Sequence, residues 1–264
     1  MVSRFRAILA RRDTLALLVT RDLKVKYSTS RLGYLWTVID PLMMSGVYWF
    51  VFTQIFSRGV GREPYLVFLL CGILPWQWAN GVIRDSSRAL TTDAKLVRST
   101  NLPREIWILR VVSTKGVEFL LSLPVLVLFV VIYQRGLSWY VLAFPLAALI
   151  QAVLLVGLGL TLAPVAVLYK DVRRMLRVGL RVLFYLSPII YGVRDVHARA
   201  PEWVQTLYMF NPLAGIFDLY RAALFPDFFA GWTEVAVAAG IALVALVVGV
   251  VVFTRLEGRV LKEI

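Results

Sequence analysis

Long apolar stretches constrain the fold of this chain more than any other feature. A helix that crosses a bilayer needs about 20 mostly apolar residues. Five stretches have that length: 36–56, 65–83, 106–133, 139–168 and 232–253. A sixth, 178–192, has only fifteen residues, and it can span if it tilts little and the basic side chains beside it snorkel.

Composition agrees with this interpretation. The chain is 59% hydrophobic and only 17% charged, which is more apolar surface than a water-soluble fold of 264 residues can bury. The same excess of apolar residues excludes a disordered chain. The sequence therefore predicts an all-α integral membrane protein with six transmembrane helices.

The net charge of +13 is distributed as membrane topology requires. If the N-terminus is cytoplasmic, 22 of the 29 basic residues fall on the cytoplasmic side, six fall outside, and Lys115 lies within the third span. Because short cytoplasmic loops are rich in Lys and Arg, we expect a multi-pass protein of the cytoplasmic membrane with both termini in the cytoplasm. A polyanion-binding protein would instead gather the charge on one face, so nucleic acid is not an expected partner.

The whole chain is predicted to form one transmembrane domain, which includes three less apolar parts. Residues 1–35 form a cytoplasmic segment, in which 3–27 have the pattern of an amphipathic helix on the lipids of the inner leaflet. Residues 85–104 form a charged cytoplasmic loop with a short helix. Residues 193–231 are too polar to span yet rich in aromatic side chains. Asn211-Pro212 divides them into two pieces, which suit interfacial or re-entrant helices at the outer face.

Motifs for catalysis and for nucleotide or metal binding are missing from the sequence. It has no glycine-rich phosphate loop, no paired catalytic carboxylates, one cysteine (Cys71) and one histidine (His197). We therefore expect no enzyme activity, cofactor or metal in this chain. Lys115 and Glu118 share a face of the third span and are interpreted as a structural pair. An ion-coupled carrier would have more mid-membrane acids, and a transferase would have clustered catalytic groups.

Aromatic and basic side chains supply the candidate site residues, and two interpretations of each stay open. The aromatic residues of the first and fifth spans are packing or belt residues, or they line a path along which sugar rings slide. These candidate channel-lining residues are Tyr48, Trp49, Phe52, Phe56, Tyr185 and Tyr191. Arg173, Arg177 and Arg181 recur every four residues, and they either set topology or dock a lipid-linked diphosphate.

Motifs in a fixed order then add a resemblance to a known family. The first are Arg21-Asp22-Leu23-Lys24-Val25-Lys26-Tyr27, Ser30-Arg31-Leu32-Gly33-Tyr34-Leu35-Trp36, Asp40-Pro41-Leu42 and Asn101-Leu102-Pro103-Arg104-Glu105. Further along come Tyr169-Lys170-Asp171-Val172, Tyr185-Leu186-Ser187-Pro188-Ile189-Ile190-Tyr191, Asn211-Pro212 and Tyr220-Arg221. Together these segments resemble ABC-2 type permeases that export polysaccharides, a family that includes O-antigen and teichoic-acid exporters. Within it the chain looks most like the permease of the actinobacterial (mycobacterial-type) cell-wall galactan exporter.

The resemblance implies a function and a set of partners. The chain would be the permease subunit of an ABC transporter that exports a glycan linked to polyprenyl diphosphate. Two copies would bind two copies of a separate ATPase, which would hold ATP and magnesium. An ABC-2 exporter of drugs or small lipids is the alternative.

The resemblance also implies roles for particular segments. Residues 3–27 would be an interfacial helix, and spans one and five would line the channel. Residues 85–104 would hold the helix that couples to the ATPase, with Asp93, Lys95 and Arg98 as its charged contacts; a plain connector is the other interpretation. Residues 201–225 would form the outer gate, with Trp203, Tyr208, Phe210, Phe217 and Tyr220.

Overall fold

The computed structural model describes residues 10–28, 32–55, 62–100, 102–133, 136 and 139–263, and every regular element among them is a helix. Five helical stretches in this part of the chain are long and apolar enough to cross a membrane. They are Gly33–Ile55, Tyr65–Thr92, Glu105–Ile132, Trp139–Leu168 and Trp232–Glu263. The all-helical membrane fold is confirmed, and these helices correspond to five of the six expected spans.

Two of these stretches are composite. The first consists of the short turn η1 (Gly33–Leu35), α3 (Trp36–Trp49) and the π-helical η2 (Phe50–Ile55). The fourth consists of η3 (Trp139–Leu142) and α7 (Ala143–Leu168). The other three are the single helices α4 (Tyr65–Thr92), α6 (Glu105–Ile132) and α12 (Trp232–Glu263).

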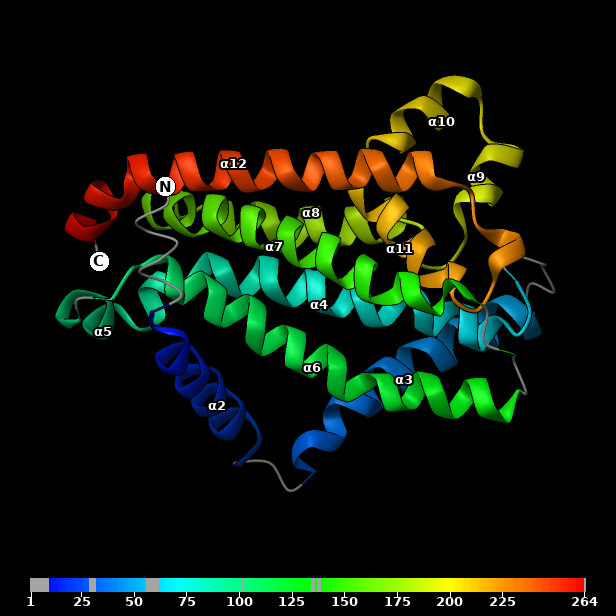
Figure 1. Cartoon of the computed structure of the whole chain (residues 1–264), viewed down its shortest axis with the longest axis horizontal. Helices are drawn as coiled ribbons and strands as arrows, with labels where there is room; N and C mark the ends of the chain where they lie inside the picture. The colour runs from blue at the N-terminus through cyan, green and yellow to red at the C-terminus, as the bar shows by residue number, and fades with distance from the viewer. Residues whose placement is uncertain are drawn as a thin grey trace.

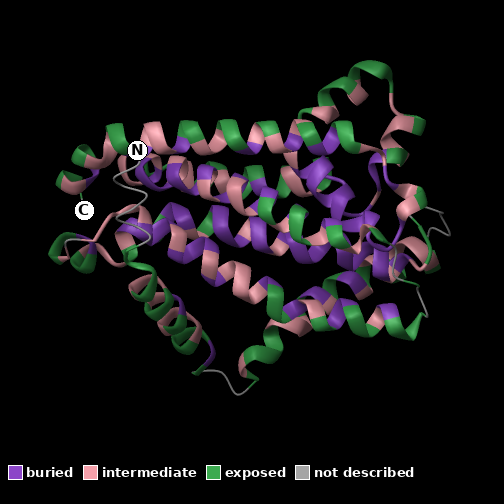
Figure 2. Ribbon diagram, viewed as in Figure 1, coloured by how far each residue is buried: buried purple, intermediate pink, exposed green. Residues whose placement is uncertain are grey.

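The long helices form a bundle around α4, which is the most deeply buried of the five stretches. Figure 1 shows α4 lengthwise between α6 and α7, with α12 beside α7, and Figure 2 shows α4 largely buried. Helices α7 and α12 pack closely because Gly157 faces the backbone of Ala245 and Leu246, and Gly249 faces the backbone of Gly157, where a Cβ would collide. Such small residues let two membrane helices approach at the backbone. One end of the bundle carries α5 (Ala94–Ser99) and the other carries α9 and α10.

The second span is longer than the sequence suggests. Helix α4 continues without a break from Tyr65 to Thr92, so the first part of the expected loop 85–104 is the last two turns of this helix. The separate short helix, α5, has only six residues and begins directly after Asp93. Its Val97 is buried and anchors it to the bundle.

The fifth expected span, 178–192, differs in the structure. The helix there, α8, runs from Val172 to Leu186, and residues 187–192 form a turn. The helix ends because Ser187 precedes Pro188: a residue before proline is driven out of the helical region, and Ser187 is indeed extended, with φ −100° and ψ 151°. Fifteen helical residues rise about 22 Å, which is less than the roughly 30 Å of a hydrocarbon core.

Between this turn and α12 lie several short helices. They are α9 (Val193–Arg199), α10 (Glu202–Met209), α11 (Pro212–Ala222) and the single turn η4 (Pro226–Phe228). The expected break at Asn211-Pro212 is confirmed, since the Asn211 side chain accepts the backbone N–H of Leu213 at 3.0 Å and caps α11. Helix α11 is buried from Leu213 to Ala222, whereas no residue of α10 is fully buried.

The N-terminal helix α2 (Arg12–Ser28) lies beside the bundle rather than within it. It leaves the α5 end obliquely in Figure 1 and packs against α6, and its two buried residues are Val19 and Tyr27. The expected amphipathic helix covered 3–27, of which residues 3–9 lie outside the described residues.

Candidate functional site

A cavity of about 530 Å³ opens between α3, α4 and α8. Helical spacing explains how these three helices build it, since side chains three or four positions apart share one face of a helix. Its walls are Met44 and Tyr48 of α3; Ile73, Trp76, Gln77, Asn80 and Arg84 of α4; and Arg177, Leu180, Arg181, Phe184 and Tyr185 of α8. We refer to this cavity as the groove.

Aromatic rings make up one part of the groove wall. The rings of Tyr48 and Phe184 stack with centroids 5.8 Å apart, and Trp76 meets Phe184 edge to face at 5.5 Å. Tyr185 in turn meets Phe184 edge to face at 5.2 Å. Flat rings with hydroxyl or indole groups suit the apolar faces and hydroxyl groups of sugars.

Positive charge makes up another part of the wall. Arg84, Arg177 and Arg181 all line the groove, and none of the described residues that line it is acidic. Gln77 and Asn80 add amide groups on the same face of α4. Because guanidinium groups match phosphate geometry with paired N–H donors, this wall suits a phosphorylated ligand.

The three arginines that recur every four residues in α8 do not all line the groove. Arg177 and Arg181 line the groove, but Arg173 points to α4, where its Nε donates to the carbonyl oxygen of Ser87 at 3.2 Å and its Nη2 donates to the Thr91 hydroxyl at 3.1 Å. Arg84 was not among the candidate site residues predicted from the sequence, where it counted only as a basic residue that sets topology. The seven-residue spacing from Gln77 to Arg84 was the available signal, because it places both on one face of α4.

The other candidate channel residues lie around the groove or away from it. Phe52 packs on Tyr65 with ring centroids 6.3 Å apart, and Trp49 is exposed beside the groove-lining Tyr48. The Tyr191 hydroxyl donates to the carbonyl oxygen of Tyr185 at 2.8 Å. Phe56 lies outside the described residues.

The five candidate gate residues fall into two groups. Trp203 of α10 and Phe210, which directly follows that helix, are exposed, and the Tyr208 hydroxyl lies 3.5 Å from that of Tyr191. Phe217 and Tyr220 of α11 are fully buried instead. The ring of Tyr220 packs between Phe119 of α6 and Phe144 of α7, with centroids 5.8 and 4.6 Å apart. Trp203 and Phe210 therefore face outward, Tyr208 is half-buried beside Tyr191, and Phe217 and Tyr220 belong to the core.

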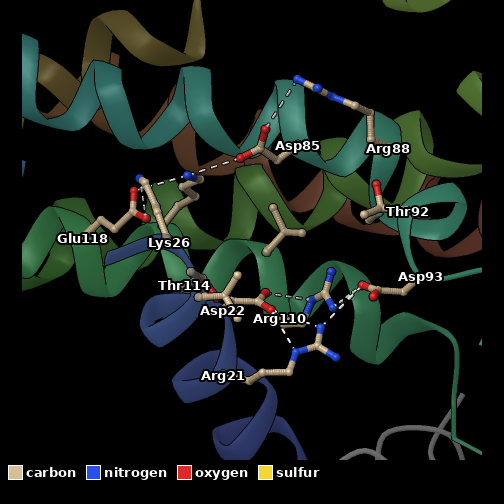
Figure 3. A pocket seen from close by; sticks show the side chains of 14 residues that line it. Arg21, Asp22, Lys26, Asp85, Arg88, Thr92, Asp93, Arg110, Thr114 and Glu118 are labelled. Atoms are coloured by element: carbon tan, nitrogen blue, oxygen red, sulfur yellow. Dashed lines mark hydrogen bonds and ion pairs between the residues drawn. The ribbon is translucent and has the colours of Figure 1, made fainter. Parts of the chain in front are cut away.

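The candidate coupling residues also separate. Lys95 and Arg98 of α5 are exposed. The Asp93 carboxylate turns inward instead, 2.5 Å from Nη1 of Arg110 and 3.6 Å from Nη2 of Arg21, as Figure 3 shows. Asp93 therefore joins helices of this chain, whereas Lys95 and Arg98 are available to another protein.

Metal binding finds no support in the part of the chain that the structure describes. No group of three or more His, Cys, Asp or Glu side chains there is arranged to hold an ion. Cys71 is a free, buried thiol in α4.

Comparisons with known proteins agree with this architecture. Residues 14–225 match the family model described as ABC-2 type transporter. The chain is 31% identical over 249 residues to the O-antigen export system permease protein RfbA of Klebsiella pneumoniae, which covers 94% of this chain and 93% of that protein. It is 27% identical to RfbA of Myxococcus xanthus, over 85% of each chain. It is also 22% identical to the polysialic acid transport protein KpsM of Escherichia coli, over 95% of this chain and 96% of that one. The family match, over most of a helical membrane bundle, shows that this chain belongs to the ABC-2 type transporters.

Proposed function

We propose that this chain is the permease subunit of an ATP-driven exporter that moves a polysaccharide across the cytoplasmic membrane. The groove between α3, α4 and α8 is the observation that carries the proposal, because it combines an aromatic wall with three arginines and no lining acid among the described residues. The names of the relatives, which are permeases for O-antigen and polysialic acid, support a polysaccharide as substrate.

The energy for transport comes from a separate subunit in this proposal. The sequence has no glycine-rich phosphate loop, and ABC transporters hydrolyse ATP on a nucleotide-binding ATPase. Two copies of this chain and two copies of that ATPase form the exporter. The exposed basic residues Lys95 and Arg98 of α5 supply contacts to the ATPase, with α5 and both chain ends on the cytoplasmic side.

The substrate is a glycan on a polyprenyl diphosphate carrier, and cell-wall galactan is our specific candidate. Arg84, Arg177 and Arg181 hold the diphosphate, because guanidinium pairs bind phosphate oxygens in a bidentate way. Tyr48 and Tyr185 then contact the first sugars through their ring faces. The polymer leaves past α10, where the exposed Trp203 and the following Phe210 form the outer gate.

Reconstitution tests this function directly. The chain is co-purified with its partner ATPase, inserted into vesicles that contain lipid-linked galactan, and supplied with ATP on the ATPase side. Export is measured as galactan that becomes accessible to an impermeant galactan hydrolase. We expect ATP-dependent accessibility. An active ATPase complex that never moves glycan, or that moves only small lipids or drugs, contradicts the proposal.

A matched pair of variants tests the groove. Arg181→Gln removes a groove cation, and Arg174→Gln removes an exposed cation of the same helix that does not line the groove. We expect the first to reduce export by at least about tenfold at an unchanged membrane level, since one charged hydrogen bond contributes roughly 1.5–3 kcal/mol. The second should export as the wild type does. Equal export by both variants removes the groove arginines from substrate binding.

A further inference from the structure

A second cavity, of about 610 Å³, lies between α2, α4 and α6 and differs in character from the groove. Positive and negative side chains alternate around it (Figure 3). We call the set of paired residues the ion-pair ladder: Arg21, Asp22 and Lys26 of α2; Asp85 of α4; Asp93, between α4 and α5; and Arg110, Lys115 and Glu118 of α6.

The first rung of the ladder lies next to α5. Asp93 pairs with Arg110 at 2.5 Å and with Arg21 at 3.6 Å, and Arg110 also pairs with Asp22 through Nε at 3.1 Å. Only 6% of the Arg110 side chain is exposed. The residue directly before α5 is thereby tied to α2 and α6 at once.

The second rung lies further along the same helices. Lys26 Nζ is 2.8 Å from one oxygen of Glu118, and Lys115 Nζ is 3.2 Å from the other. Lys115 also lies 3.2 Å from Asp85 of α4. This rung joins α2, α6 and α4.

Helical spacing aligns the two rungs. Asp22 and Lys26 are four residues apart on α2, and Arg110 and Glu118 are eight apart on α6, so each pair shares one face of its helix. Because the carboxylates and Arg110 are mostly shielded from water, salt screens these pairs less than ordinary surface pairs. Groups that share partners in this way form one network rather than independent contacts.

The ladder leads from α5 to the groove by two routes. On α4, the ladder residue Asp85 directly follows the groove residue Arg84, whose Nε lies 3.9 Å from it. On α2, Tyr27 packs on Tyr34 of η1 with ring centroids 4.3 Å apart, and η1 continues into α3, which carries the groove residue Tyr48. A displacement of α5 therefore has a continuous path of partners to two walls of the groove.

We propose that the ion-pair ladder makes α2 move with α5, so that engagement of an ATPase at α5 is transmitted through α2 to α3 and the groove. This inference rests on the proposed function, since it needs an ATPase that contacts α5. Asp93 and Arg110 are positioning residues in this arrangement: they act through α2 and contact no substrate. Coupling of this kind requires a physical element that both sites bias, and α2 is that element.

The test removes the three α2 charges from the ladder while leaving the pairs between Asp93, Arg110, Asp85, Lys115 and Glu118 intact. The ladder variant is Arg21→Gln/Asp22→Asn/Lys26→Gln. The matched control is Arg12→Gln/Asp13→Asn/Lys24→Gln, which makes the same chemical changes at exposed positions of the same helix. Both are purified with the ATPase and reconstituted with the lipid-linked glycan. The measured quantity is glycan exported per ATP hydrolysed.

We expect the ladder variant to hydrolyse ATP within about twofold of the control and to export at least tenfold less glycan per ATP. Equal ratios in the two variants overturn the ladder proposal. A wild-type complex that hydrolyses ATP without export contradicts the proposed function instead, so the two failures are distinguishable.

A distance measurement keeps the proposal testable if the triple variant does not assemble. Spin labels are placed at Leu17→Cys of α2 and Ser99→Cys of α5, both exposed positions, while the buried Cys71 stays unlabelled. In the wild-type background we expect the distance between the labels to stay constant, within about 2 Å, when ATP is added. In the single variant Lys26→Gln we expect the distribution of this distance to broaden. A wild-type distance that changes on ATP addition shows that α2 and α5 move separately and overturns the proposal.

Discussion

Arg221 of α11 donates from Nη2 to the carbonyl oxygen of Ile189 at 2.6 Å. Its Nη1 donates to the carbonyl oxygens of Pro188 at 2.6 Å and Tyr191 at 2.9 Å. The guanidinium is fully buried and lies 3.8 Å from the ring centroid of Phe68. Burial lowers the pKa of Arg221 to about 10, so the group still carries its charge at neutral pH. One side chain of α11 thus holds the turn that ends α8.

Replacing this arginine should therefore destabilise the protein. We expect Arg221→Met to lower the free energy of unfolding by roughly 3–5 kcal/mol, because it leaves several buried carbonyl groups without a donor. Arg221→Lys should recover part of the loss. Arg199→Met, at an exposed position of α9, is the control and should change stability by less than about 0.5 kcal/mol. Thermal unfolding in detergent, followed by tryptophan fluorescence, measures the difference, and equal midpoints for Arg221→Met and Arg199→Met contradict this account.

The close packing of α7 and α12 depends on glycine. A Cβ at Gly157 would meet the backbone of Ala245 and Leu246, so Gly157→Ala must push the two helices apart. We expect a loss of about 1–3 kcal/mol in stability. Gly240→Ala lies on α12 where nothing is within 4 Å of the new methyl group, and we expect it to be neutral or to stabilise by about 0.5–1 kcal/mol. Unfolding midpoints of the two variants, compared in the same detergent, test the contrast, which disappears if α7 and α12 can separate without cost.

Asp218 should make stability depend on pH. Its Oδ2 accepts the backbone N–H of Ala230 at 2.8 Å, and its Oδ1 is buried without a hydrogen-bond partner among the described residues. The pKa of Asp218 is raised to about 6: burial is the main cause and Glu234 adds to it, whereas the Ala230 N–H, Arg221 and Arg194 oppose the rise.

The sign of this dependence follows from proton binding. Between the ordinary aspartate pKa of 3.8 and the folded-state pKa of about 6, the folded state binds more protons than the unfolded state. Stability should therefore fall as pH rises from about 4 to about 6, by roughly 1–3 kcal/mol in total, and change little above that range. Asp218→Asn should flatten this part of the profile. Unfolding midpoints at pH 4.5 and 7.0 provide the measurement, and parallel profiles for variant and wild type would exclude Asp218 as the source.

Charge reversal should distinguish two residues that the sequence grouped together. Asp93→Lys places a cation beside Arg110 and Arg21, so we expect a lower membrane level and an unfolding midpoint reduced by several degrees. Arg98→Glu changes an exposed side chain, so its stability should match the wild type while its binding to the ATPase weakens by about tenfold. Membrane level and ATPase co-purification separate these effects. A stable Asp93→Lys protein would show that its inward ion pairs contribute little.

Much of the architecture could be predicted from local patterns. Runs of apolar residues indicated five of the spans, since the length of an apolar run depends on the sequence alone. The break at Asn211-Pro212 was equally predictable, because a helix cap and a proline act within a few residues. Tyr48, Tyr185, Arg177 and Arg181 were also singled out from the sequence, and the structure brings them together in one groove.

The predictions that the structure corrected concern features that depend on residues far apart in the sequence. Helix α8, at the fifth expected span, ends at Leu186 because of Pro188, and the turn that follows accepts hydrogen bonds from Arg221, which lies about thirty residues later in the sequence. Tyr220 looked like a gate residue from its aromatic character, yet it is buried between α6 and α7. Hydropathy cannot distinguish a membrane-facing ring from a core ring, because both environments are apolar.

The sequence by itself determined that this chain is a helical membrane protein, where most of its spans lie, and which family its motifs resemble. Those properties follow from the apolar runs and from residues close together along the chain. Only the tertiary structure decided which charges face a groove, which face a partner and which pair internally. Asp93 and Lys95 differ by two positions, yet the first is tied to Arg110 and the second is exposed. The partner of each charge comes from a distant helix, and packing alone sets that distance.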